Sequence, residues 1–365
     1  MPGPSVRFAP VSQVRAGGRT GTEPDATMTG VPEDRGSSAG RATFALVIPT
    51  HQRPDLVVQA VESALRQSRP FDQVIVVPDG LDDPSVAALA GYPVEVVAIE
   101  KAGVAAARNA GTAHARTDWV CFLDDDDLLH PEYLARIEAE TATGAQAMNT
   151  GYWSFAAEAG PADEFSAGTL DECLEAVRTA RPRKDLGYLQ IEGRSFDLLL
   201  ERMRGSMSTT AVRRDVLTRA GGFPTGVVTG QDWVMYVNVA RLTEWHLVPD
   251  RLGFFRDHPS TITRTGSPLK GLTALRVIRS FWRPSELPTP AHRPLDAYRP
   301  YYRHVLGWAL RACWRARDVR AYREALAISR EILPRRSDRL SAMAPRWVHR
   351  ASAAMRRRMP RRQRA

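Results

Sequence analysis

Four consecutive carboxylates, Asp124 to Asp127, are the residues of this chain whose types and spacing most clearly suggest chemistry. They follow an apolar run, Trp119–Leu123, which is typical of a short strand buried on both faces. Four acids at the end of a buried strand repel one another strongly unless a cation lies among them. A hard divalent ion such as Mg²⁺ accepts one or two carboxylates and completes its shell with water and phosphate oxygens. The pattern therefore favours a metal–phosphate site over the alternative, a solvated acidic turn.

A second acid, Asp232, lies in the stretch Gly230-Gln231-Asp232-Trp233. Apolar residues with helical spacing follow it, so the stretch is expected to open a helix. An acid in the first turn of a helix meets the positive end of the helix dipole. Taken alone, Asp232 is better explained as a helix-capping acid than as a group that does chemistry.

Alternating strands and helices are expected to position these acids. Buried strands are predicted at residues 44–48, 73–77, 94–99 and 119–123, and the segments between them have helical character. Such alternation specifies a parallel sheet with helices on both faces. The fold class predicted is therefore α/β, with a mostly parallel twisted sheet.

Polar residues follow three of the four predicted strands, at Thr50–Arg53, Asp79–Gly80 and Asp124–Asp127. In an open α/β sheet, ligands bind in a crevice at the carboxyl ends of the strands, so these residues are expected to converge there. The sequence contains no glycine-rich phosphate-binding motif after a strand. A nucleotide bound in this crevice would therefore be held through a metal rather than through a backbone nest.

Composition divides the chain into five segments. A main domain is predicted at residues 42–281, with a nucleotide half at about 42–130 and an acceptor half at about 131–281. Before it lies a disordered segment, 1–41, rich in Gly, Pro, Ser, Thr and Arg. After it come a proline-rich linker, 282–300, and two amphipathic helices, 301–334, expected to pack on the main domain. The last segment, 335–365, is a basic tail.

The net charge of +9 is concentrated in that tail, which carries eleven Arg and one acid. The rest of the chain is nearly neutral, which does not fit a nucleic-acid-binding domain, where charge lines a folded face. Two interpretations of the tail stay open. It could make a peripheral contact with anionic lipid or acidic polymer, or it could be a solubilising end. The sequence favours the second.

The three cysteines, Cys121, Cys173 and Cys313, are far apart, which argues against a disulfide framework or a thiolate zinc site. This usage is typical of a reducing compartment. No apolar run reaches the length of a membrane span, and the N-terminus has no apolar signal region. A cytoplasmic protein is expected, in contact with the inner membrane face only if the tail binds lipid.

The order of these motifs resembles that of family 2 glycosyltransferases with a GT-A fold. The resemblance covers about Phe44 to Thr263, and no single motif carries it alone. The matching pieces, in chain order, are Val47–Pro54, Val74–Gly80, Ala107–Gly111, Phe122–Asp127, Gly221–Phe223, Gln231–Trp233 and Phe255–His258.

This resemblance implies a site for a nucleoside diphosphate sugar. The first turn, at Pro49 and Thr50, and Asp79 after the second strand would hold the base and ribose. The full set of donor-binding residues that it implies is Pro49, Thr50, Arg53, Asp79, Arg108, Asp124 and Asp125.

The resemblance also implies a divalent metal, Mg or Mn, and a catalytic base. The acidic run looks like the Asp-x-Asp element of the family, with Asp126 and Asp124 on the ion and His258 as a further metal or phosphate contact. Asp232 looks like the base of an inverting transfer. The acceptor would be a glycan, a lipid or a small molecule. It is expected to be selected by residues 152–205, with Tyr152, Trp153 and Trp245 available for stacking unless they are core residues.

The sequence departs from the family pattern in two places. Pro78 stands where an acid often precedes Asp79, and Gln231 stands where Glu often precedes the base. These departures leave open a non-catalytic relative that binds sugar nucleotides. A haloacid-dehalogenase-like phosphatase also places Asp-x-Asp after a buried strand, but it expects the motif on the first strand rather than the fourth.

Overall fold

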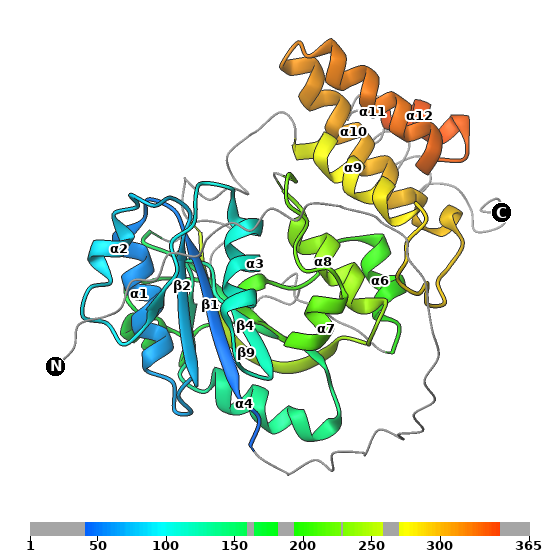
Figure 1. The fold of residues 1–365 in the computed structure, drawn as a ribbon. Coiled ribbons are helices and arrows are strands. Elements are labelled where there is room, and N and C mark those ends of the chain that lie inside the picture. Colours follow the sequence, from blue (N-terminus) through cyan, green and yellow to red (C-terminus); the bar gives the residue numbers. More distant parts are fainter. Residues whose placement is uncertain (1–40, 159–163, 182–192, 228, 258–269, 344–365) are drawn as a thin grey trace, which may run out of the picture.

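The structure is a computed structural model, and it describes residues 41–158, 164–181, 193–227, 229–257 and 270–343. Within these ranges nine strands form one sheet, in the order β3-β2-β1-β4-β8-β6-β9-β5, with β7 paired to β6 (Figure 1). The strands are β1 (Phe44–Thr50), β2 (Gln73–Pro78), β3 (Glu95–Val96), β4 (Trp119–Phe122), β5 (Leu128–Leu129), β6 (Ala147–Ala156), β7 (Phe165–Ser166), β8 (Thr210–Arg213) and β9 (His246–Arg256).

Helices cover both faces of this sheet. They are α1 (Pro54–Leu65), α2 (Ser85–Ala88), α3 (Val104–His114), α4 (Tyr133–Glu140), α5 (Leu170–Ala176), α6 (Ser195–Glu201), α7 (Arg214–Arg219), α8 (Gln231–Ala240), α9 (Lys270–Phe281), α10 (Arg299–Arg315), α11 (Val319–Ile332) and α12 (Arg336–Met343). Short 3-10 turns occur at Thr141–Thr143, Met207–Thr209 and Leu295–Tyr298. The predicted α/β fold with a mostly parallel sheet is confirmed.

The parallel half of the sheet is formed by β3, β2, β1 and β4. Every residue of β1 and β4 is buried, as expected for strands covered on both faces. The strand predicted at 94–99 is only two residues long, and Ile99 adds an isolated bridge to Asp79. It lies at the edge of the sheet and has a neighbour on one side only, which accounts for its short pairing.

The second half of the sheet is mixed. Strand β8 pairs antiparallel with both β4 and β6, β9 runs parallel to β6, and β5 pairs antiparallel with β9. A 3-10 turn, Met207–Thr209, comes directly before β8, which pairs from Thr210 onward. The two halves are therefore joined through β4 and β8, immediately before the acidic run.

Separate apolar cores lie on the two faces of the sheet. One includes Val47, Val77 and Phe122 with side chains of α3 and α8, and the other includes Leu46 and Ile48 with side chains of α1 and α4. Helix α3 packs very closely on β1, since a Cβ at Gly111 would lie 2.4 Å from Val47 Cγ1. This close approach places the start of α3 beside the carboxyl ends of β1 and β2.

The C-terminal helices α9, α10, α11 and α12 pack on one another, beside α8 (Figure 1). Residues 282–298 belong to the segment predicted as a linker, 282–300, and they pack against the main domain: Arg293 pairs with Asp197 at 2.9 Å, and the hydroxyl of Tyr298 donates to the same carboxylate at 2.7 Å. The segment predicted as a basic tail begins with α12, whose buried Asp338 binds Arg299. No helix in the described ranges is both long and apolar enough to cross a membrane.

Candidate active site

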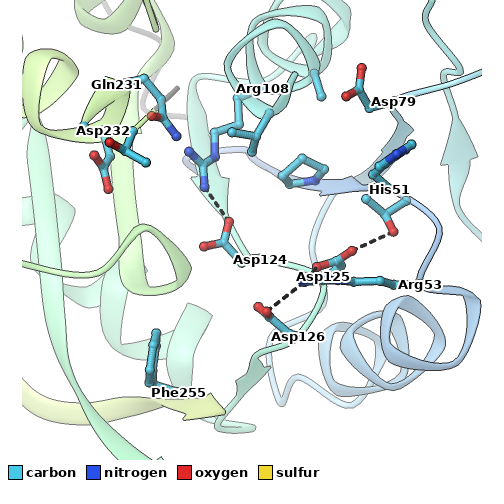
Figure 2. Close-up of a pocket in the computed structure, with 16 residues that line it drawn as sticks. His51, Arg53, Asp79, Arg108, Asp124, Asp125, Asp126, Gln231, Asp232 and Phe255 are labelled. Carbon is cyan, nitrogen blue, oxygen red and sulfur yellow. Dashed lines mark hydrogen bonds and ion pairs between the residues drawn. The ribbon is translucent and has the colours of Figure 1, made fainter. Parts of the chain in front are cut away.

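A cavity of about 360 Å³ opens where the strands of the parallel half end (Figure 2). It is enclosed by the loops after β1, β2 and β4, the first turns of α3 and α8, and the end of β9. The residues that line it are Pro49, Thr50, His51, Arg53, Asp79, Val104, Ala107, Arg108, Asp124, Asp125, Asp126, Thr229, Gly230, Gln231, Asp232 and Phe255. All the site residues predicted from the sequence are among them except His258, which lies outside the described residues.

The charges of the acidic run are balanced in part by two arginines of the chain itself. Arg108 Nη2 lies 2.5 Å from Asp124 Oδ1. Arg53 Nη1 lies 3.0 Å from Asp125 and 2.8 Å from Asp126. The two arginines thus relieve the repulsion among the carboxylates without any ion. Repulsion alone is therefore not an argument for a metal.

Asp125 is nearly buried, and Thr50 donates a hydrogen bond to its Oδ2 at 2.8 Å. Burial, with a smaller contribution from the negative charge of Asp126, raises the pKa of Asp125 to about 6. The guanidinium of Arg53 opposes this shift. Asp125 therefore anchors the acidic run to the loop after β1 and is poorly placed to bind an ion.

Asp127 is buried and is not among the residues that line the cavity. It accepts hydrogen bonds from Ser208 Oγ at 2.5 Å and from the backbone N–H of Arg256 at 2.9 Å. Burial raises its pKa well above the ordinary value. Ser208 Oγ also accepts the backbone N–H of Asp124 at 3.1 Å. Asp127 and Ser208 together therefore fix the backbone conformation of the acidic run.

Arg256 completes this support, because its Nε donates to the carbonyl of Asp126 at 2.9 Å and its guanidinium lies 4.7 Å from the ring centre of Phe155. Sequence reasoning assigned no role to Ser208 or Arg256. The available signal for Arg256 was its place in the motif Phe255–His258, whereas Ser208 lies in a polar run that gives no local indication of its partner.

Asp79 is buried at the cavity wall, where its carboxylate accepts the backbone N–H groups of Ala102 and Gly103 at 2.7 and 3.0 Å. These bonds hold the loop that leads into α3. Gly103 has a φ of +92°, a conformation that favours glycine at this turn.

Asp232 lies in the first turn of α8, across the cavity from the acidic run, with Arg108 between them (Figure 2). Its Oδ1 accepts the backbone N–H of Trp233 at 2.8 Å. Burial raises its pKa, the positive charge of Arg108 opposes that rise, and Asp124 adds to it. A raised pKa makes the ionised carboxylate a stronger proton acceptor than an exposed aspartate.

Arg108 is 4% exposed, and its guanidinium lies 5.4 Å from the ring centre of Phe223. Its Nε and Nη1 have no hydrogen-bond partner among the described residues. Buried guanidinium groups are normally satisfied, and an anionic oxygen in the cavity would supply the missing acceptor.

The carboxylates alone do not complete the coordination shell of a divalent ion, and phosphate oxygens and water would have to supply the other ligands. No group of three or more His, Cys, Asp or Glu residues in the described ranges is arranged to hold a metal. The side chains of Asp124 and Asp126 both border the cavity and are 34% and 14% exposed. Two carboxylates with room for phosphate oxygens and water fit the requirements of Mg²⁺ or Mn²⁺.

Of the aromatic residues considered for sugar stacking, Trp245 belongs to the core, because it is 2% exposed and its indole N–H donates to the carbonyl of Tyr236. Trp153 lies under Arg251, 4.5 Å from the guanidinium carbon. Tyr152 lies against Phe255, with ring centres 5.7 Å apart, and Phe255 lines the cavity.

Comparison with known proteins bears on the family and the fold of the chain. Residues 45–149 match the model of Glycosyl transferase family 2. Succinoglycan biosynthesis protein ExoO of Rhizobium meliloti is 39% identical over 105 residues, which are 27% of this chain and 30% of that protein. An uncharacterized glycosyltransferase of Haemophilus influenzae is 25% identical over 193 residues, 52% of this chain and 59% of that protein. The chain thus spans less than two thirds of these curated relatives.

Among solved structures, the crystal structure of S. aureus TarS 1-349 in complex with UDP-GlcNAc superposes with a TM-score of 0.53 at 14% identity. The match covers 79% of this chain and 92% of that one. At this identity the match shows the fold alone. The family match and the fold together confirm the resemblance noted in the sequence: residues 45–149 are similar to the family 2 glycosyltransferases, and the fold is GT-A.

Proposed function

We propose that this protein transfers a sugar from a nucleoside diphosphate sugar to an acceptor hydroxyl, with inversion at the anomeric carbon and with the help of a divalent metal. The observation that carries the proposal is the position of Asp232. It borders the same cavity as Asp124 and Asp126, but from the opposite wall, with Arg108 between them. An inverting transfer needs the donor diphosphate and the base for the acceptor on opposite sides of one space.

The donor would occupy the side of the cavity formed by the parallel strands. Asp79 borders the part of the cavity far from Asp232 (Figure 2), and it is assigned to the base and ribose together with Pro49 and Thr50, which line the same cavity. Arg53 and Arg108 are assigned to the diphosphate, because guanidinium groups bind phosphate oxygens through paired hydrogen bonds. The unpartnered nitrogens of Arg108 support this assignment.

Asp124 and Asp126 would hold the metal, which when bound neutralises the charge that develops on the departing diphosphate. Asp125 contributes by keeping the acidic run attached to Thr50 and Arg53. Because Asp124 and Asp126 are each paired with an arginine, metal and donor are expected to bind together, with the diphosphate taking over the arginines.

Asp232 would act on the acceptor. As the acceptor oxygen forms its bond to the anomeric carbon, the bond from that carbon to the diphosphate breaks, and the proton of the acceptor hydroxyl passes to the Asp232 carboxylate. Phe255, with Tyr152 behind it, offers an aromatic wall for the acceptor.

The first test is a panel of nucleoside diphosphate sugars, each measured for thermal stabilisation of the purified protein with and without Mn²⁺. A ligand that binds the folded state raises the unfolding temperature, and the rise grows as the ligand concentration exceeds the dissociation constant. We expect one donor to stabilise the protein strongly, and only with the metal. Stabilisation without any slow hydrolysis or transfer of that donor would favour the non-catalytic relative instead.

Replacing Asp126 by Ala tests the metal assignment. The variant is expected to fold, because Arg53 keeps Asp125 as a partner, but to lose the metal-dependent part of donor binding. Isothermal titration of the donor at increasing Mn²⁺ measures this. A donor affinity in Asp126→Ala that still rises with Mn²⁺ as in the wild type would contradict the role.

A further inference from the structure

The turn between α10 and α11 carries two strongly exposed apolar side chains. Trp314, at the end of α10, is 76% exposed, and Val319, at the start of α11, is 60% exposed. The indole contacts Tyr322 through an edge-on ring pair at 6.4 Å and otherwise extends into solvent. Five of the seven large apolar residues exposed in the described ranges lie between residues 308 and 343, so this exposure is a property of the C-terminal helices rather than of the surface in general.

Positive charge surrounds these two side chains. The arginines concerned are Arg315, Arg317, Arg320 and Arg323, all of them exposed and none in an ion pair with a described residue. The acidic side chains nearby already have hydrogen-bond or ion-pair partners. Asp318 accepts the N–H of Ala321 at the start of α11, and Glu324 binds Arg276 at 2.7 Å. We call the surface formed by Trp314, Val319 and the four arginines the α10–α11 tip.

Helix α12 directs the chain toward this tip. It runs beside α10 in the same direction, since its Asp338 binds Arg299 and Arg303 while the carbonyl of Ala342, one turn later, would meet a Cβ on Gly307 at 2.7 Å. At Met343 the chain is therefore about 10 Å, or two helical turns, short of Trp314 along α10. The remaining sequence, 344–365, contains eight Arg and no acid.

We propose that the α10–α11 tip docks on the surface of a bilayer that contains anionic phospholipid. Tryptophan is suited to the boundary between lipid and water, because its ring is apolar while its N–H is polar. Arginines near an anionic leaflet each add roughly 1 kcal/mol of attraction. A soluble acidic polymer would satisfy the arginines but would leave the indole and Val319 without a function. The proposal does not depend on the proposed transfer reaction and goes beyond it.

The test uses the purified full-length chain in a flotation assay with vesicles of phosphatidylcholine, alone or mixed with phosphatidylglycerol. We expect binding to the mixed vesicles only.

Arg315→Gln combined with Arg320→Gln should lower the partition coefficient by about 30-fold, the equivalent of two surface charges. The matched control, Arg219→Gln with Arg283→Gln, removes two exposed and unpaired arginines elsewhere and should bind as the wild type does. Equal losses in the two double variants would overturn the proposal.

The apolar contribution is tested with Trp314→Ser, which retains every charge. Its indole is exposed, so thermal unfolding should not change, whereas vesicle binding should fall several-fold. If Trp314→Ser binds like the wild type while the arginine variant does not, the tip is a site for polyanions and the membrane assignment is wrong. If both variants bind like the wild type, the tip is not the contact surface.

Discussion

Asp232 combines two features at the scale of a single residue, partial burial that raises its pKa and a first-turn position in α8. Either feature alone is compatible with a helix-capping acid. Its place across the cavity from Asp124 is what a capping role does not explain.

Replacing Asp232 by Asn should lower the transfer rate by about 10²- to 10⁴-fold, the usual contribution of a general base. Donor binding should hardly change, because the donor is assigned to the opposite wall. The measurement pairs single-turnover transfer with donor titration. Asp215→Asn, which also removes an acid from the first turn of a helix, is the matched control for helix stability. A donor affinity that falls in step with the rate would remove Asp232 from the role of base.

Asp125 predicts a pH dependence of stability. Its pKa in the folded protein is about 6, above the ordinary value of 3.8, so the folded state holds this proton more tightly than the unfolded state. Stability from this group is therefore full below pH 3.8 and is lost as the pH rises toward 6. The Asp125→Asn variant loses no stability in this way. As the pH rises from about 4 to about 7, its free energy of unfolding should therefore increase by about 2 kcal/mol relative to that of the wild type. Urea unfolding without metal at both pH values measures the difference, and a constant difference would contradict the raised pKa.

At the scale of elements, the contact between α3 and β1 depends on Gly111. Ala would improve helix propensity by about 1 kcal/mol, but its Cβ would overlap Val47, and overpacking of a rigid core costs about 1 to 3 kcal/mol. Gly111→Ala should therefore destabilise the protein. In a Val47→Ala background the same change should become neutral or stabilising, because the clashing methyl groups are gone. Denaturant unfolding of the four proteins of this cycle measures the coupling, and equal effects in both backgrounds would show that the overlap is harmless.

Ser208 provides a second contact between elements, because it lies just before β8 and hydrogen-bonds to the acidic run that follows β4. Ser208→Ala removes one of the two hydrogen bonds that the buried Asp127 accepts and leaves the N–H of Asp124 without its acceptor, which costs about 1 to 3 kcal/mol. It should also weaken metal-dependent donor binding, since the backbone of Asp124 is no longer fixed.

The matched control for this prediction is Ser195→Ala. Ser195 is a buried hydroxyl that likewise donates to a carboxylate, Glu244, and accepts a backbone N–H, from Trp245, but it lies outside the cavity. Both variants should lose similar stability, and only Ser208→Ala should lose donor affinity. If the two variants behave alike in donor titration, Ser208 is a structural residue only.

At the scale of the whole molecule, the sequence predicted the parallel strands and the meeting of their polar ends. Continuous apolar runs define buried strands locally, and parallel strands share one carboxyl edge. It could not predict that β8 inserts between β4 and β6, because that order depends on pairing between distant segments. Ser208 and Arg256 reach the acidic run only through this order, which is why their contacts were missed. The arginine pairs of the acidic run lie within the parallel half and were also missed, because they join side chains of segments distant in the sequence, although Arg53 and Arg108 themselves were predicted as site residues.

The interleaved strand order also governs when a newly made chain can acquire its cavity. Strand β5 follows the acidic run directly but pairs with β9, and the backbone of that run is bonded to Arg256, the last residue of β9. A growing polypeptide that has emerged from the ribosome only as far as β8 therefore has the four carboxylates of the acidic run but not β9, the strand that fixes their backbone. Donor nucleotides cannot assist the early stages of its folding, and any product truncated before residue 256 lacks a formed pocket, however much of the parallel sheet it retains.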